Sequence, residues 1–204
     1  APVADVLTNP GNTAIGTRSF GSDASMVADM VIKELEGLSS QGVFGAVKHF
    51  PGQGGVSGDS HDGAVTLDKS LEELMQTELV PFQKALENGV SFVMVGHISV
   101  PQVVGDNTPA SLSQMMVSNV LREQLGYQGI VITDAMNMGA VTGNYTADQA
   151  AVMAVNAGVD MILMPQDYET AYNGLLQAVQ DGTISEERID ESVERIVKVK
   201  LQMQ

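Results

Sequence analysis

The chain has 204 residues, a length that fits one domain and can bury a sizeable core. Its 25 Asp and Glu against 10 Lys and Arg give a formal net charge of −15, which argues against nucleic acid or an anionic membrane surface as the main ligand. With 44% hydrophobic and 17% charged residues, and with no apolar stretch long enough to span a bilayer, the sequence predicts a soluble globular protein.

Five short runs of apolar, mostly β-branched residues are predicted to be buried strands of a parallel sheet. Longer segments of helical period separate them, which is the pattern of βα units. The expected strands are Pro2–Leu7, Val43–His49, Val90–Gly96, Ile130–Asp134 and Asp160–Met164.

The segments between and after these strands are predicted to be helices, because apolar residues recur in them every three or four positions. Glycines that suit a helix C-cap follow most of them. The expected helices are Ala24–Gly37, Leu71–Asn88, Ser113–Leu125, Ala147–Ala157, Tyr168–Gln180 and Ser185–Gln202.

The spacing of the strands predicts the architecture. At this pace eight βα units would need well over 200 residues, and a (β/α)8 barrel has roughly 250 residues or more. Residues 1–204 are therefore predicted to form a single, partial (β/α)8 TIM-barrel-type domain with about five strands, lacking the first ones. The alternative is an open, doubly wound sheet.

Functional side chains of parallel α/β proteins collect just beyond the carboxyl ends of the strands. Asp134 closes the apolar run GIVITD, where an unpaired buried carboxylate would be costly. It is expected either to take part in chemistry or to cap a turn or helix at 135–140. The other polar residues at such positions are Thr8, Asn9, Arg18, Lys48, His49 and His97.

The segment from Phe50 to Val65 contains five glycines and one proline, so it is predicted to be a long, permissive loop of the kind that often carries function. Asp59 and His61 lie within it. An aspartate two residues from a histidine can accept a hydrogen bond from one imidazole nitrogen, which makes a proton-transfer dyad. The same residues also suit a solvated turn.

A metal site of the hydrolase type is a further alternative. The chain has no cysteine, which excludes thiolate ligands and disulfides and leaves the redox compartment open. The histidines and aspartates at the strand ends lack the His-x-His or helical spacing that makes metal binding specific. These residues are His49, Asp59, His61, His97 and Asp134.

Three motifs in order carry a resemblance to a known family. They are PVADVLTNPGNTAIGTRSFGSD (residues 2–23), KHFPGQGGVSGDSH (48–61) and VITDAMNMGAV (131–141). The sequence resembles glycoside hydrolase family 3, specifically its β-N-acetylglucosaminidase type. The similarity covers essentially the whole chain, and its tail (183–200) resembles the last helix of the family's catalytic domain.

The resemblance implies a retaining hydrolysis by double displacement on a (β/α)8-type barrel. Asp134 matches the nucleophile, His61 the acid/base and Asp59 its partner. The resemblance implies no metal and no cofactor. The positions that hold the hydroxyls of the non-reducing sugar match Arg18, Lys48 and His49.

The chain departs from the family pattern in two places. The family commonly has a second histidine where this chain has Gln53, which bears on loop geometry and sugar preference. An Asp-x-Glu-Gly-Gly segment that supplies a sugar-binding aspartate has no match upstream of Ala1. An open barrel would expose the backbone edge of a strand, so we expect either association with a complementary segment or weak activity.

The resemblance therefore predicts an exo-acting enzyme that removes terminal β-linked N-acetylglucosamine from peptidoglycan or chitin fragments. A β-glucosidase of the same family is one alternative, and a phosphorolytic variant is a minor one. A non-catalytic fragment that binds sugar or a complementing chain is the alternative from another class. The expected partners are a small carbohydrate and a complementing chain or second copy at the open edge, with no nucleic acid and no membrane. The chain begins without a methionine or a leader-like segment, so the compartment stays open between cytoplasm and cell exterior.

Overall fold

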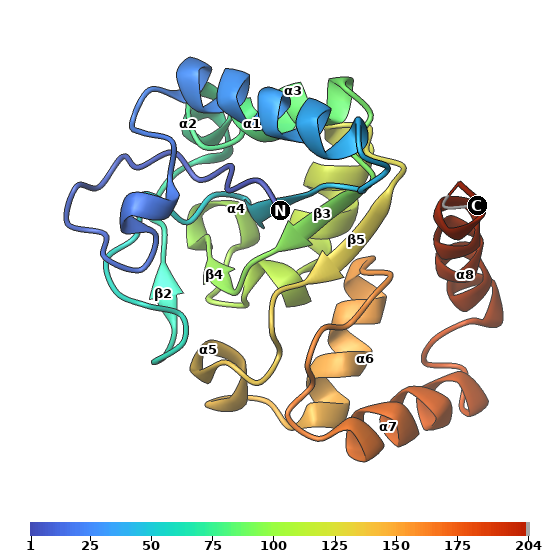
Figure 1. The fold of residues 1–204 in the computed structure, drawn as a ribbon. Helices are drawn as coiled ribbons and strands as arrows, with labels where there is room; N and C mark the ends of the chain where they lie inside the picture. The colour runs from blue at the N-terminus through green and yellow to red at the C-terminus, as the bar shows by residue number, and fades with distance from the viewer. Residues whose placement is uncertain (203–204) are drawn as a thin grey trace.

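The computed structural model describes residues 1–202, which form a parallel sheet with helices around it (Figure 1). Three strands lie in the order β1 (Ala46–Phe50), β3 (Phe92–Val95) and β5 (Ile130–Thr133). Each neighbouring pair runs parallel, as the sequence predicts.

Two isolated parallel bridges extend this row on either side. Val3 pairs with Lys48 beyond β1, and Met161 pairs with Ile132 beyond β5. The row thus has five strand positions, which account for about five of the eight strands of a (β/α)8-type barrel. The predicted strands Pro2–Leu7 and Asp160–Met164 are reduced to single bridges, and within residues 1–202 each has a pairing partner on one side only.

Most predicted helices are present, with one interruption. The expected helix Leu71–Asn88 is two helices, α2 (Leu71–Gln76) and α3 (Val80–Glu87). Pro81 lies in the first turn of α3, where its missing N–H costs no helical hydrogen bond, whereas in mid-helix it would break the ladder. The single-helix prediction is therefore wrong here.

The remaining long helices follow the expected bounds closely. They are α1 (Ala24–Ser39), α6 (Ala147–Ala157), α7 (Tyr168–Gln180) and α8 (Glu186–Leu201). The predicted helix Ser113–Leu125 is a π-helix, η3 (Met115–Gln124), in which Leu125 N–H donates to Val120 O. Figure 1 shows α1 above the sheet, α6 and α7 below it, and α8 apart at the right.

Several short elements at the strand ends have too few residues for sequence periodicity to predict them. β2 (Val65–Thr66) and β4 (Ile98–Ser99) form a separate two-stranded parallel sheet. The others are α4 (Pro101–Val104), α5 (Gly139–Thr142) and the 3-10 turns η1 (Gly16–Arg18) and η2 (Ala110–Leu112).

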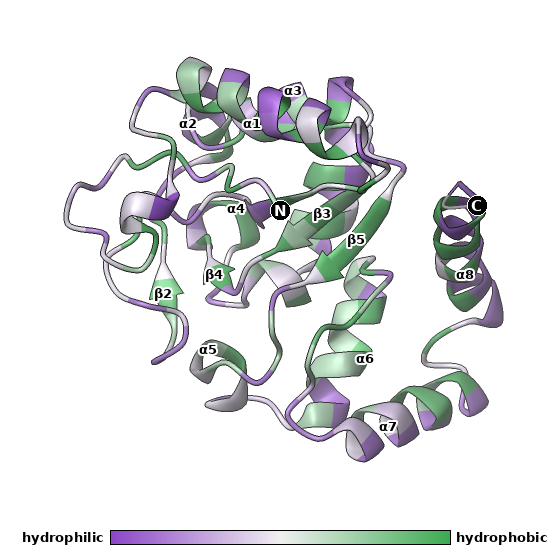
Figure 2. Cartoon of the chain, in the orientation of Figure 1, coloured by the Kyte–Doolittle hydropathy of each residue, from purple (hydrophilic) through white to green (hydrophobic). Residues whose placement is uncertain are grey.

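The core lies between the sheet and the helices that cover it. Val93, Val95 and Val131 are fully buried on β3 and β5, which appear as hydrophobic strands in Figure 2. Phe50 and Phe82 meet edge to face, with ring centroids 5.5 Å apart and an interplanar angle of 89°. This contact packs α3 against β1.

Two helices present apolar side chains to solvent at a spacing of four residues, which is the pattern of a packed helix face. We call these two sets of side chains the apolar stripes: Tyr168, Tyr172 and Leu176 on α7, and Val193, Val197 and Leu201 on α8.

Within the described residues, no helix is both long and apolar enough to cross a bilayer.

Candidate active site

Asp134 stands directly after β5, at the carboxyl end of the sheet. Its N–H donates to Val95 O at 2.8 Å, and its Oδ1 accepts from the N–H of Ala135 at 2.8 Å. The side chain is 16% exposed, so the carboxylate is held by the backbone yet open to a ligand. Asp134 does not cap the following helix α5, whose N-cap is Met138, although its carboxylate accepts from the N–H that begins the turn at 135–138.

His49 faces Asp134 from the end of β1. Its Nε2 lies 3.8 Å from Asp134 Oδ2, and its Nδ1 lies 2.8 Å from Oδ2 of Asp5. Asp5 is fully buried, and its Oδ1 also accepts from the N–H of Gln53 at 2.6 Å. A carboxylate accepts hydrogen bonds, so Nδ1 of His49 donates and the ring is fixed with Nε2 toward Asp134.

Asp5 is a site residue that sequence reasoning missed. It lies in the predicted strand Pro2–Leu7. A carboxylate in an apolar strand run is also the sequence signal that indicates Asp134. The same argument applies to Asp5, because a buried carboxylate must find hydrogen-bond donors. It finds them in the backbone and ring of His49 and in the backbone of Gln53.

His97 follows β3 and is almost completely buried near Asp134 and His49. Its Nε2 lies 3.0 Å from the carbonyl oxygen of Ala135, and its Nδ1 lies 2.7 Å from Oγ of Ser111. Burial lowers the pKa of His97, although the hydrogen bond to Ala135 and the charge of Asp134 oppose that effect. Burial therefore favours the neutral form of the His97 ring.

The predicted contact between Asp59 and His61 is present. Asp59 Oδ1 accepts from the N–H of His61 at 2.9 Å and lies 2.7 Å from His61 Nδ1. These two hydrogen bonds lower the pKa of Asp59, and the charge of Arg18 lowers it further. The His61 side chain is 65% exposed, so its Nε2 is accessible.

The loop that carries this dyad is attached to the segment that follows Asp134. The N–H of Gly139 donates to His61 O at 3.0 Å, and the N–H of Ala140 donates to Ser60 O at 3.1 Å. A Cβ at position 139 would lie 2.7 Å from His61 O, so only glycine permits this approach. Backbone contacts therefore bring His61 and Asp134 to the same end of the sheet.

Gln53, where the family pattern commonly has histidine, lies buried inside the loop. Its side-chain Nε2 donates to Ser60 Oγ at 3.2 Å, and its backbone carbonyl oxygen accepts from Asn12 Nδ2 at 2.6 Å. Asn9 Nδ2 also donates to Val56 O at 3.1 Å. The loop is thus tied both to itself and to the segment after the first strand position.

A buried ion pair lies beneath the glycines of the same loop. Glu78 Oε1 accepts from Lys69 Nζ at 2.6 Å and from Thr8 Oγ1 at 3.2 Å, and Glu78 is fully buried. A Cβ at Gly52 would lie 2.8 Å from Cβ of Glu78, and one at Gly55 would lie 2.8 Å from Thr8 Oγ1. Because these two positions are glycines, the backbone of the loop can pack directly against Glu78 and Thr8.

The predicted sugar-binding residues occupy different surroundings. Arg18 is exposed at the end of η1, and its Nη2 donates to Ala14 O at 2.5 Å. Lys48 is half-buried in β1 beside His49, and its backbone pairs with Pro2 and Ala4. Within residues 1–202, no group of three or more metal-ligating side chains is arranged to hold a metal ion.

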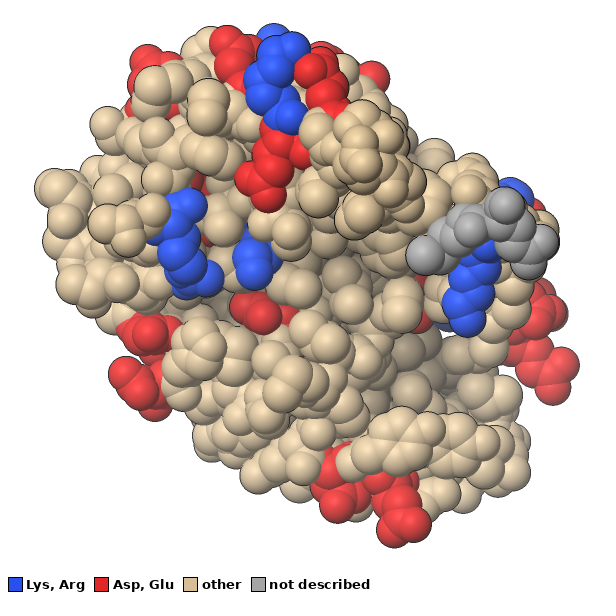
Figure 3. Space-filling model, viewed as in Figure 1, with Lys and Arg blue, Asp and Glu red and all other residues tan. Residues whose placement is uncertain are grey.

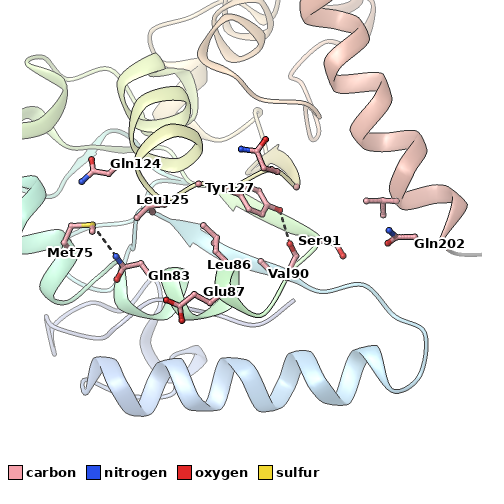
Figure 4. A pocket seen from close by; sticks show the side chains of 15 residues that line it. Met75, Gln83, Leu86, Glu87, Val90, Ser91, Gln124, Leu125, Tyr127 and Gln202 are labelled. Atoms are coloured by element: carbon pink, nitrogen blue, oxygen red, sulfur yellow. Dashed lines mark hydrogen bonds between the residues drawn. The ribbon is translucent and has the colours of Figure 1, made fainter.

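A cavity of about 600 Å³ lies at the opposite end of the sheet (Figure 4). Val90 and Ser91, which precede β3, line it together with Gly129, which precedes β5. Tyr127 projects into this region, and its hydroxyl donates to Val90 O at 3.4 Å. This cavity is therefore at the amino ends of the strands, away from Asp134.

Comparisons with known proteins identify the family of this chain. The model of the glycosyl hydrolase family 3 N-terminal domain matches residues 1–199. The structure of a glycoside hydrolase family 3 β-N-acetylglucosaminidase from Paenibacillus sp. str. FPU-7 superposes with a TM-score of 0.97 at 41% identity, covering 100% of this chain and 39% of that one.

Two curated relatives are also named as enzymes that act on β-hexosaminides. Beta-hexosaminidase LpqI of Mycobacterium bovis is 37% identical over 98% of this chain and 53% of that protein. A beta-N-acetylglucosaminidase/beta-glucosidase of Cellulomonas fimi is 33% identical over 98% of this chain and 37% of that protein. The chain thus spans about half or less of the length of these relatives.

Proposed function

Because the chain belongs to glycosyl hydrolase family 3, we propose that it carries the catalytic part of a retaining β-N-acetylhexosaminidase. The observation that supports this most directly is the attachment of the Asp59–His61 loop to Gly139 and Ala140, five and six residues after Asp134. A nucleophile and a proton donor are what a double displacement needs on the two sides of a glycosidic bond.

In the proposed first step, Asp134 attacks the anomeric carbon of the terminal sugar. The bond from that carbon to the leaving oxygen breaks, and His61 donates a proton to this oxygen, which leaves a glycosyl ester on Asp134. In the second step His61 takes a proton from water, the water oxygen attacks the anomeric carbon, and the carboxylate of Asp134 is released. Asp59 holds Nδ1 of His61 throughout.

The proposed sugar contacts are Arg18, Lys48 and His49. Among these, His49 is the best supported, because Asp5 fixes its ring and its Nε2 lies 3.8 Å from Asp134. A polar group of the sugar near the anomeric carbon would thus meet a rigid imidazole rather than a mobile side chain. Fixed partners cost no reorganisation in the transition state, which is why they favour catalysis.

We propose terminal N-acetylglucosamine of peptidoglycan or chitin fragments as the substrate. The support is that similar proteins are named as β-hexosaminidases and β-N-acetylglucosaminidases. The Cellulomonas fimi relative is named for both β-N-acetylglucosaminidase and β-glucosidase. A β-glucosidase activity is therefore the second candidate.

We also propose that residues 1–204 are one partial barrel domain whose open edges are covered by further strands. The support is that within the described residues Val3 and Met161 each pair on one side only, and that the apolar stripes of α7 and α8 are exposed. Unpaired edges and apolar helix faces are features that proteins usually cover. A longer chain, a complementing chain or a second copy could supply the cover.

One experiment tests activity and assembly together. The purified chain is assayed with 4-nitrophenyl N-acetyl-β-glucosaminide and the corresponding glucoside, and light scattering gives the mass of the same sample. We expect turnover of the acetamido sugar, its loss in Asp134→Ala and its retention in Asp181→Asn, a change at an exposed aspartate that caps a turn through Thr183.

The outcomes separate the proposals. Full activity in Asp134→Ala would overturn the assignment of the nucleophile, and faster turnover of the glucoside would favour the second candidate. A folded, monomeric and fully active chain would overturn the proposal that the edges need a cover. An inactive folded monomer would agree with that proposal, and adding the upstream half of a relative's barrel should then restore turnover.

A further inference from the structure

His97 makes two hydrogen bonds with groups of different kinds. One partner is the carbonyl oxygen of Ala135, at 3.0 Å from Nε2, and the other is the hydroxyl of Ser111, at 2.7 Å from Nδ1. A carbonyl oxygen only accepts, so Nε2 must carry the proton. In the neutral ring Nδ1 then accepts, and the Ser111 hydroxyl donates to it.

Both partners are held in place by the fold. Ser111 is fully buried in η2, and its N–H donates to Gly96 O at 3.2 Å. Ala135 lies between Asp134, whose N–H donates to Val95 O, and Met136, whose N–H donates to Leu163 O at 2.9 Å. His97 therefore connects the η2 turn to the first residue after the candidate nucleophile.

The Ala135 backbone links His97 to the carboxylate of Asp134. The carbonyl of Ala135 accepts from His97, and its N–H donates to Asp134 Oδ1 at 2.8 Å. Fixing the carbonyl and the N–H of one residue fixes its two backbone dihedrals, and with them the direction of the N–H. The direction of that N–H decides where Oδ1 lies.

We propose that His97, as the Nε2–H tautomer held by Ser111, is a positioning residue that fixes the Asp134 carboxylate through the backbone of Ala135. His97 acts without touching the sugar, unlike His49, whose ring faces the carboxylate directly. The role of Asp134 as nucleophile rests on the proposed function, whereas the tautomer and the hold on the carboxylate do not.

The tautomer can be tested without any activity. In the chain labelled with ¹⁵N-histidine, long-range ¹H–¹⁵N correlations at pH 7 show which nitrogen of each of the three rings is protonated. The missing signal in His97→Gln identifies His97. We expect a protonated Nε2 and an unprotonated Nδ1. A protonated Nδ1, alone or together with Nε2, would overturn the proposal.

The hold on Asp134 is tested with a pair of variants at position 97. His97→Gln places an amide N–H about where Nε2 was, so it can still donate to Ala135, whereas the shorter His97→Asn cannot. We expect the ¹³C resonance of the Asp134 carboxyl to move in His97→Asn and much less in His97→Gln. Identical spectra in wild type and His97→Asn would contradict the proposal.

Where the chain is active, kinetics add an independent readout. A misplaced nucleophile lowers kcat by about 100-fold in His97→Asn, with KM changed by less than about twofold and with equal losses for good and poor leaving groups. Ser111→Ala should show a smaller loss of the same kind. Ser113→Ala, an equal truncation of a buried serine two residues away, should show none. A loss confined to poor leaving groups would instead assign His97 to proton transfer.

Discussion

At the scale of single residues, Gly139 is the position where one methyl group would separate the two halves of the candidate site. A Cβ there would lie 2.7 Å from His61 O and 3.0 Å from the carbonyl carbon of Asp62. Both are backbone atoms, so the loop rather than a flexible side chain would have to move. The backbone conformation of Gly139 itself is not in the left-handed region.

Gly139→Ala is therefore expected to impair proton transfer by His61. Since general acid catalysis contributes about 10²–10⁴-fold, we expect at least a 10-fold loss with poor leaving groups and a smaller loss with 4-nitrophenol, which leaves without protonation. Kinetics with a series of aryl glycosides measures this. Gly63→Ala, in the same loop and with open space around its Cβ, is the control, and equal losses for all leaving groups would contradict the prediction.

The residues of the site could be predicted to different extents. Asp134 and the Asp59–His61 pair were accessible because each combines a reactive group with a local pattern, a strand end or a two-residue spacing. Asp5 was accessible in principle, as a carboxylate in an apolar run. Ser111 was not, because its contact with His97 joins residues 14 apart through the fold and leaves no local signal.

At the scale of elements, one buried carboxylate connects α8 to the sheet. The side chain of Asp160 is fully buried and accepts from Arg122 Nη2 at 2.6 Å, Ser192 Oγ at 2.7 Å and Arg195 Nη1 at 3.1 Å. It also accepts from the N–H of Val131 in β5 at 2.9 Å. Asp160 thus links the sheet to α8 and to the π-helix.

Asp160→Asn leaves these buried guanidinium groups without their anion. Removing one partner of a buried ion pair costs about 3–5 kcal/mol, so we expect the free energy of unfolding to fall by an amount of that order. We also expect amide hydrogens to exchange faster in α8 than in β5. Urea unfolding and exchange measure these effects. Glu194→Gln breaks an exposed pair with Lys198 and should lower the free energy of unfolding far less, because solvent screens that pair; an equal cost would contradict the prediction.

The elements were predictable where local chemistry decides them. α6 begins after the capping box of Thr146 and Gln149 and ends at Gly158, which has a φ of 111°, and these signals fix its bounds in the sequence. The outer strands were overpredicted, because an apolar run indicates burial but not the number of pairing partners. The sequence predicts an ordinary helix where the π-helix lies, because its buried residues Met116, Val117, Val120 and Leu121 recur at a spacing that also fits an α-helix.

At the scale of the whole molecule, the buried His97 makes stability depend on pH. Burial lowers its pKa in the folded chain below the unfolded value of about 6.5. The unfolded chain therefore binds more protons as the pH falls through that value, and folding stability decreases. The folding stability that arises from this pKa difference is fully present above about pH 6.5 and is lost as the pH falls below that value.

We therefore expect the urea midpoint to fall between pH 7 and pH 5, and to fall less in His97→Gln, which has no titrating ring. Denaturation followed by circular dichroism at both values measures this. An equal decrease in the variant would contradict the assignment of the effect to His97.

The architecture was predictable because it depends on repetition. Runs of apolar strand residues followed by amphipathic helices recur along the chain, and the structure confirms a parallel row with five strand positions. The three-dimensional attachment of the loop after β1 was not predictable, since its contacts with Asn9, Asn12 and Gly139 join three separate loops.

The arginine cluster around Asp160 has a consequence for how copies of this chain behave in solution. Arg122, Arg188 and Arg195 are three of only 10 cationic Lys and Arg side chains, and all three point at one interior carboxylate. The surface therefore keeps few cationic side chains to offset its acidic ones, and Figure 3 shows Asp and Glu around much of the rim. Copies repel one another at low ionic strength, so any pairing of two open edges strengthens as salt is added.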